Sequence, residues 1–115
     1  MEQTNPQPNM SGWKGRDFEF LIVGDIQISN EEFDEIMTPN SMHWSKFEKN
    51  GWPHYKVDED DFNYSWEMPG IQMTFNDEIS FDKARMIADE VVANIKATGQ
   101  NAELQIIDST KVNQF

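Results

Sequence analysis

The sequence predicts an α+β fold in which one antiparallel sheet carries helices on one of its faces. Four segments alternate apolar with polar residues at the period of a strand: residues 17–28, 54–58, 62–68 and 102–107. Two other segments place apolar residues at helical spacing: residues 31–37 and 81–98. Aromatic residues form 12% of the chain, which distinguishes it from disordered acidic chains, because those contain few aromatics.

The first strand is expected over residues 17–28. Five apolar side chains of one parity line its expected buried face: Phe18, Phe20, Ile22, Ile26 and Ile28. Gly24 falls in the same row, and we expect a bulge or bend there because glycine has no side chain to pack. A helix over residues 31–37 follows, with Ser29 or Asn30 as its N-cap and Pro39 after its end.

The middle of the chain predicts a second short helix and a hairpin. Two aromatic residues at helical spacing favour a helix over residues 41–49, and Asn50-Gly51 predicts a turn after it. Residues 54–58 and 62–68 then form the two strands of a hairpin. Their connection is the acidic turn, which we define as residues 58–61.

The alternation changes parity at Pro69-Gly70, which fits either a kinked strand or a second hairpin. We favour the kinked strand, because Pro-Gly suits a type II turn and tight hairpins use primed turns. The helix over residues 81–98 has Ser80 as its N-cap and Gly99 at its C-terminal end, and a last strand follows it. The order β-α-β-β-α-β is the ferredoxin-like split βαβ arrangement, with both helices on one face of the antiparallel sheet.

The length and composition predict one domain. A chain of 115 residues buries enough surface for a single core. Residues 1–12 are polar and include two prolines, so we expect a flexible N-terminal tail before a domain over residues 13–110, with residues 111–115 frayed. The chain shows neither a signal peptide nor an apolar run approaching the ~20 residues that span a bilayer, so a cytoplasmic protein is the simplest expectation.

Net charge is the strongest functional signal in the sequence. Nine basic residues against 21 acidic ones give a net charge of −12. Such a chain is repelled by nucleic acid and by anionic membranes and is attracted to basic protein surfaces. The absence of cysteine excludes disulfides, thiol catalysis and thiolate metal sites.

The acidic turn, Asp58-Glu59-Asp60-Asp61, is the densest charge cluster in the sequence. A calcium site is disfavoured, because an EF-hand loop starting at Asp58 would need an acid or amide at its fifth position and glycine at its sixth, where Phe62 and Asn63 stand. Contact with a basic partner and a solvated turn remain as alternatives.

Seven aromatic residues and both histidines gather between positions 43 and 66. They could form part of a core and a protein interface, or wall a small-ligand pocket. Single-stranded nucleic-acid binding would also need a basic groove, which this segment does not provide. His43 and His54 stand in no ligand or catalytic motif, and no serine-nucleophile motif occurs, so we expect a non-enzymatic protein without a metal or cofactor.

These observations favour a small interaction protein that inhibits or blocks a basic, nucleic-acid-binding partner by DNA mimicry. Its expected partner-binding residues are acids and two apolar anchors: Asp58, Glu59, Asp60, Asp61, Glu31, Glu32, Asp34, Glu35, Trp52 and Trp66. The alternative is a regulatory or chaperone-like domain that binds a ligand or forms a homodimer through an aromatic sheet face. An enzyme using Asp and Glu with a recruited metal is the third alternative.

Overall fold

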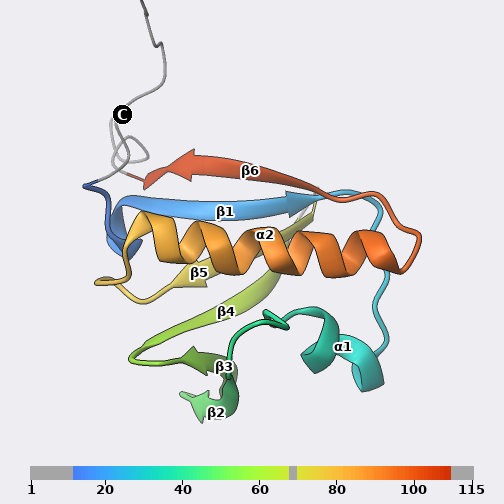
Figure 1. Ribbon diagram of the computed structural model, residues 1–115, viewed down its shortest axis with the longest axis horizontal. Coiled ribbons are helices and arrows are strands. Elements are labelled where there is room, and N and C mark those ends of the chain that lie inside the picture. The colour runs from blue at the N-terminus through green and yellow to red at the C-terminus, as the bar shows by residue number, and fades with distance from the viewer. Residues whose placement is uncertain (1–11, 68–69, 110–115) are drawn as a thin grey trace, which may run out of the picture.

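A computed structural model describes residues 12–67 and 70–109 and confirms an α+β domain (Figure 1). Its elements, in chain order, are η1 (Gly15–Asp17), β1 (Phe18–Val23), α1 (Asn30–Ile36), β2 (Ser45–Lys49), β3 (Trp52–Val57), β4 (Asp60–Glu67), β5 (Gly70–Phe75), α2 (Phe81–Ala97) and β6 (Glu103–Asp108). The tail expected over residues 1–12 lies outside the described residues except for Gly12, and the frayed end expected over residues 111–115 lies wholly outside them. None of the helices in the described ranges is long and apolar enough to cross a membrane.

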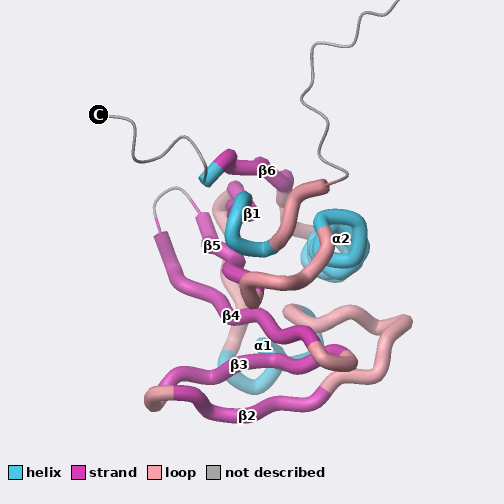
Figure 2. The backbone as a smooth tube through the Cα atoms, turned by 90° about the vertical axis from the view of Figure 1, so that its left-hand side faces the viewer, coloured by secondary structure: helices cyan, strands magenta, loops and turns pink. Residues whose placement is uncertain are grey.

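The sheet has six antiparallel strands in the order β2-β3-β4-β5-β1-β6. Figure 2 shows this succession, with α2 on one side of the sheet. The expected ferredoxin-like order is not matched, because four strands, β2 to β5, lie between α1 and α2 where the sequence predicts two. Since β1 pairs antiparallel with both β5 and β6, α2 connects two strands that run in the same direction on either side of β1.

Strand β1 is shorter than the alternation predicts. Its pairing ends at Val23, and Gly24 follows with φ of 147°. A Cβ atom on Gly24 would lie 2.5 Å from the carbonyl oxygen of Asn101, so glycine allows the two backbones to approach there. Gly24 therefore ends the strand instead of bending it. Ile26 lies in the loop after β1 and is buried, so the apolar row continues into the core beyond the end of the strand.

The helix predicted over residues 41–49 is wrong, because β2 occupies most of that segment. Asn50 and Gly51 explain why: both have positive φ, 56° and 77°, as a type I′ hairpin turn requires. Lys49 pairs with Trp52 across this turn, and the turn aligns β2 on β3. The turn predicted at Asn50-Gly51 is confirmed. The two aromatic residues stand at helical spacing by chance, because no helix forms there.

The hairpin of β3 and β4 is confirmed, but its turn is tighter than predicted. Val57 pairs with Asp60, so only Asp58 and Glu59 form the turn, and Asp60 and Asp61 belong to β4. The kinked strand favoured at Pro69-Gly70 is wrong. Strands β4 and β5 are antiparallel, with Glu67 opposite Gly70, so the chain reverses between them. Met68 and Pro69 themselves lie outside the described residues.

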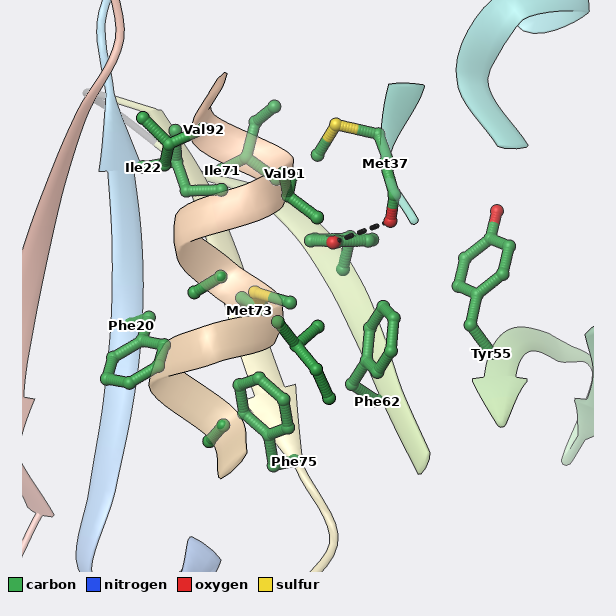
Figure 3. Close-up of a cluster of buried hydrophobic side chains, with 14 of the residues drawn as sticks. Phe20, Ile22, Met37, Tyr55, Phe62, Ile71, Met73, Phe75, Val91 and Val92 are labelled. Carbon is green, nitrogen blue, oxygen red and sulfur yellow. Dashed lines mark hydrogen bonds between the residues drawn. The ribbon is translucent and has the colours of Figure 1, made fainter. Parts of the chain in front are cut away.

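Helix α2 covers the sheet and buries its predicted apolar face. Its side chains pack near Phe20 and Ile22 of β1 and near Ile71 and Met73 of β5 (Figure 3). The buried residues of α2 are Phe81, Ala84, Ile87, Ala88, Val91, Val92 and Ile95. The Ser80 hydroxyl accepts a hydrogen bond from the Lys83 amide at 3.2 Å, which confirms the predicted N-cap.

Helix α1 lies on the same face as α2 and over the outer strands. Its Phe33 ring meets the Tyr64 ring of β4 edge-on, with the ring centroids 5.8 Å apart. The amide of Asn94 on α2 donates to the carbonyl oxygens of Ile36 and Thr38 at 3.1 and 2.9 Å, which ties the two helices together. Both helices therefore contact residues of the same face of the sheet.

Candidate partner-binding surface

An open cavity of about 370 Å³ lies between α1 and the outer strands. We call it the aromatic pocket. Five of its nine lining residues are aromatic; the full set is Asn30, Phe33, Asp34, Lys46, Trp52, Pro53, Tyr55, Tyr64 and Trp66. Its volume is at the lower end of the range of small-ligand sites.

The walls of the aromatic pocket come from the alternation of β4 and from the short helix α1. Tyr64 and Trp66 share the covered parity of β4, but Tyr64 is buried and Trp66 is 56% exposed. The Tyr64 hydroxyl donates to the buried carbonyl oxygen of Met37 at 2.8 Å, which is the dashed contact in Figure 3. Asn30, Phe33 and Asp34 of α1 are spaced at i, i+3 and i+4, so one helix face closes the other side.

Trp52 is held at the rim of the aromatic pocket by its indole N–H. The register of β3 on β4 covers Tyr55 to Val57, so Trp52 lies beyond the paired residues. Its Nε1 donates to the carbonyl oxygen of Tyr64 at 3.1 Å. The ring remains 50% exposed. The pocket therefore presents two half-exposed tryptophans, Trp52 and Trp66, that are anchored in the sheet.

Asp34 is the charged centre of the aromatic pocket. It accepts a hydrogen bond from the Tyr55 hydroxyl at 2.6 Å and pairs with the Lys46 ammonium at 3.1 Å. Burial acts to raise the pKa of Asp34, but the hydrogen bonds from Tyr55 and Lys46 outweigh it, so the pKa is lowered. Burial first, and then the hydrogen bond to the Asp34 carboxylate, raise the pKa of Tyr55 well above its ordinary value.

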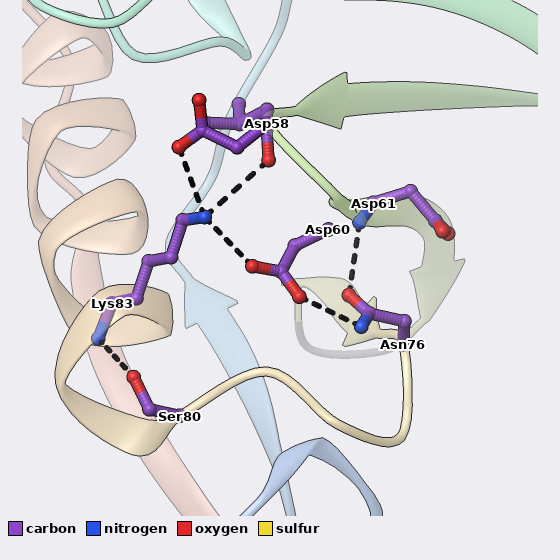
Figure 4. Close-up of polar contacts among 7 residues, drawn as sticks. Asp58, Asp60, Asp61, Asn76, Ser80 and Lys83 are labelled. Carbon is purple, nitrogen blue, oxygen red and sulfur yellow. Dashed lines mark hydrogen bonds and ion pairs between the residues drawn. The ribbon is translucent and has the colours of Figure 1, made fainter.

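The acidic turn lies away from the aromatic pocket, and most of its carboxylates form hydrogen bonds or ion pairs within the protein. The Lys83 ammonium pairs with Asp60 and Asp58, and the Asn76 amide donates to Asp60 at 2.9 Å while accepting from the Asp61 amide at 2.9 Å (Figure 4). Asp61 also contacts His54, with Nδ1 to Oδ1 at 3.2 Å. Asp60 is buried, and Glu59 is exposed at the tip.

The ten residues predicted to bind a partner thus fall into two groups. Glu31, Glu32, Asp34 and Glu35 lie on α1, and Asp34 among them lines the aromatic pocket with Trp52 and Trp66. Residues 58–61 lie at the other end of β3, in the turn to β4 and its first residues. At the rise of a strand, that separates the turn from Trp52 by ~20 Å. Sequence reasoning did not identify Phe33 and Lys46 as pocket residues, whereas Tyr55 and Tyr64 belong to the aromatic segment that it considers as the wall of a small-ligand pocket.

The two histidines lie apart from the aromatic pocket. In the described ranges no three His, Asp or Glu side chains are placed to hold a metal. The His54–Asp61 pair lines a shallow hollow with Lys49, Asn63 and Asn76, and no hydroxyl nucleophile lines it. His43 is exposed in the loop before β2.

Comparison of the chain with protein-family models, with curated protein sequences and with solved structures finds no match. Function is therefore argued from the chain's own surface.

Proposed function

We propose that this protein is a non-enzymatic interaction protein that binds a basic surface of a partner protein. The contact is made by α1 together with the aromatic pocket. The observation that supports this most is the placement of two half-exposed tryptophans at a cavity that also contains Asp34 of α1. This short helix bears three further carboxylates, Glu31, Glu32 and Glu35, and no basic residue. Tryptophans in such positions are frequent energetic centres of protein interfaces.

Net charge supports a basic partner. At −12 the chain attracts positively charged surfaces over distances of about one Debye length, ~10 Å at ordinary ionic strength. If the partner's basic surface serves nucleic acid, the bound protein acts as an inhibitor that excludes phosphates from it. The carboxylates of α1 then steer association, and the aromatic residues supply the desolvated centre.

The acidic turn has a smaller part in this proposal. Asp60 and Asp61 are assigned a structural role, because their hydrogen bonds and ion pairs are used within the fold. Asp58 and Glu59 remain as a secondary contact, since their side chains are exposed. The tryptophans and the α1 carboxylates are therefore the first residues to test.

The size of the aromatic pocket favours a second candidate, a small-ligand-binding domain. A cavity of about 370 Å³ with mostly aromatic walls suits a small apolar or planar molecule. The two candidates differ in their dependence on salt. Binding of a neutral ligand is insensitive to ionic strength, whereas binding of a basic partner weakens as salt is added.

The experiment is a tryptophan-fluorescence titration with a short peptide of alternating arginine and glycine. The matched control peptide carries glutamate in place of arginine. We expect the basic peptide to bind, and to bind several-fold more weakly as salt rises from about 0.05 to 0.2 M. Binding that ignores salt, or equal binding of the glutamate peptide, would contradict the proposal.

Two triple variants locate the contact. Glu31→Gln, Glu32→Gln and Glu35→Gln together remove three charges from α1, and we expect affinity to fall roughly tenfold, at about 0.5 kcal/mol per charge. The control removes three exposed charges elsewhere, with Asp25→Asn, Asp82→Asn and Glu103→Gln. If both triple variants lose the same affinity, only the net charge matters and the site is not on α1.

A further inference from the structure

The aromatic pocket already contains a cation from its own chain. Lys46 extends from β2 and places its ammonium 3.1 Å from Asp34 and 6.0 Å from the centre of the Tyr55 ring. A carboxylate and an aromatic face are the two groups that stabilise an ammonium or guanidinium outside water. The pocket is thus chemically a cation site, and Lys46 occupies it from within.

Lys46 is a replaceable occupant. Its side chain is 45% exposed and that of Asp34 is 37% exposed. Exposed ion pairs of this kind are weak, because water competes for both charges and the lysine loses side-chain freedom. Lys46 also stands on an edge strand, since β2 pairs only with β3 in the described sheet. Its side chain can leave without breaking any strand pairing.

Asp34 stays in place when Lys46 leaves. The hydroxyl of the buried Tyr55 donates to Oδ1 of Asp34, whereas Lys46 contacts Oδ2. Displacement of Lys46 therefore leaves Oδ2 open toward the cavity while Oδ1 remains held. Such a preorganised acceptor lowers the entropic cost of binding a second cation.

The rest of the pocket fits a guanidinium better than an ammonium. The two half-exposed indoles, Trp52 and Trp66, offer flat apolar faces at the cavity. A guanidinium is planar, more weakly hydrated than an ammonium, stacks on aromatic faces and donates several hydrogen bonds to a carboxylate. An arginine can therefore contact both the indoles and Asp34. Lys46 contacts Asp34 and lies over the Tyr55 ring.

We propose that the aromatic pocket binds one arginine side chain of the basic partner, and that this arginine displaces Lys46 from Asp34. The inference rests on the proposed function and names the group that the partner inserts. Lys46 then acts as a built-in competitor. It lowers affinity for every cation, so only side chains that also stack on the indoles bind well.

The first arm of the test compares two blocked tripeptides, Gly-Arg-Gly and the same peptide with citrulline in place of arginine. Citrulline keeps the shape of arginine and removes its charge. Tryptophan fluorescence of the full chain reports binding. We expect the arginine peptide to bind at least about tenfold more tightly than the citrulline peptide, as for a charge-assisted contact.

The second arm tests the competitor. Lys46→Met removes the ammonium, and we expect tighter binding of the arginine peptide by about threefold, the range of an exposed ion pair. The matched control is Lys56→Met on β3, which removes the same charge from an exposed position that does not line the pocket. Lys46→Gln serves as a second removal, and circular dichroism checks that each variant is folded.

The outcomes separate the inference from the proposed function. Equal effects of Lys46→Met and Lys56→Met, or equal binding of arginine and citrulline, overturn the arginine pocket. If the arginine–glycine peptide still binds through α1 in those cases, the proposed function survives without it. If no basic peptide binds at all, both are wrong. Tighter binding confined to the Lys46 variants supports both.

Discussion

The ammonium of Lys83 on α2 lies 2.7 Å from the carboxylate of Asp60 on β4, and the Asp60 side chain is only 8% exposed. The same ammonium lies 3.1 Å from Asp58, whose side chain is 68% exposed. Burial acts to lower the pKa of Lys83, but the hydrogen bonds to Asp60 and Asp58 outweigh it and raise the pKa. One lysine therefore joins the helix to the hairpin turn through a buried and an exposed partner.

We expect the buried partner to matter more for stability. Asp60→Ala removes the buried acceptor of Lys83 and of the Asn76 side-chain amide. It should cost about 2 kcal/mol, less than for a fully buried pair because Lys83 is partly solvated and keeps Asp58. Asp58→Ala removes the exposed partner of the same lysine and should lower the free energy of unfolding by less than about 1 kcal/mol. Urea denaturation of both variants measures the difference. Equal losses would show that burial of the pair contributes nothing.

The hydroxyl of Tyr64 should stabilise the junction of α1 with the sheet. Tyr64→Phe leaves the buried carbonyl of Met37 unpaired, so we expect a loss of about 1–2 kcal/mol. Tyr55→Phe is the matched control, because its partner Asp34 keeps Lys46 and contact with water. A smaller loss is expected there in the same urea experiment. A Tyr64→Phe protein as stable as the natural chain would contradict this role.

Gly15 allows the η1 turn to approach the loop before α2. A Cβ atom there would lie 1.8 Å from the carbonyl oxygen of Asn76, whereas one on Gly12 meets nothing within 4 Å. Gly15→Ala forces the backbones apart and should destabilise the protein by about 1–3 kcal/mol. Gly12→Ala should leave the melting temperature unchanged. Similar melting temperatures for the two variants would argue against the close approach.

The protein should lose stability in alkali. Burial, followed by the charge of Tyr55, raises the pKa of Tyr64, and the pKa values of Tyr55 and Lys83 are raised as well. Groups with a raised folded pKa contribute stability that is complete below the unfolded pKa and is lost as pH rises toward the folded pKa. Stability should therefore fall above about pH 10, the ordinary tyrosine pKa.

Urea midpoints measured at several values between about pH 8 and 11 test this loss, which spans the ordinary pKa values of tyrosine and lysine. The variant with both Tyr55→Phe and Tyr64→Phe should lose less stability over the same interval, because two of the three groups no longer titrate. A flat profile for the natural chain would rule out the tyrosine contribution.

Added salt should stabilise the fold. The net charge of −12 produces self-repulsion, which screening weakens. We expect the melting temperature to rise as sodium chloride increases from about 0.05 to 0.5 M, a range over which the Debye length falls well below 10 Å. A constant or falling melting temperature would indicate that the internal ion pairs, such as that of Lys83, outweigh the repulsion.

Local sequence patterns correctly predicted elements whose signal is local. Helix α2 follows from its apolar stripe and the Ser80 cap, and the turn at Asn50-Gly51 follows from the backbone freedom of those two residues. The same patterns were wrong where tertiary contacts decide. Ile26 continues the apolar alternation of β1 but is buried from a loop position. Residues 45–49 form a strand because β3 pairs with them.

The sequence indicates several of the residues that form the candidate site, but not how they are arranged in space. The exposed tryptophans and Asp34 are among the predicted partner-binding residues, but the sequence contains no sign that these three side chains line one cavity. Lys46 carried no signal either, because its contacts with Asp34 and Tyr55 depend on the hairpin position. The acidic turn is the reverse case. It is the densest charge cluster in the sequence, but Asp58 and Asp60 form ion pairs with Lys83, which is distant in the chain.

By itself, the sequence determined the α+β class, the long helix α2, the tight turn after β2 and the net charge of −12, because each depends on residues close together in the chain or on composition alone. The tertiary structure alone decided the six-strand order, the pairing of Asp60 with Lys83 and the aromatic pocket. These join segments that are distant in sequence. Their contacts depend on burial and strand pairing, which no local period encodes.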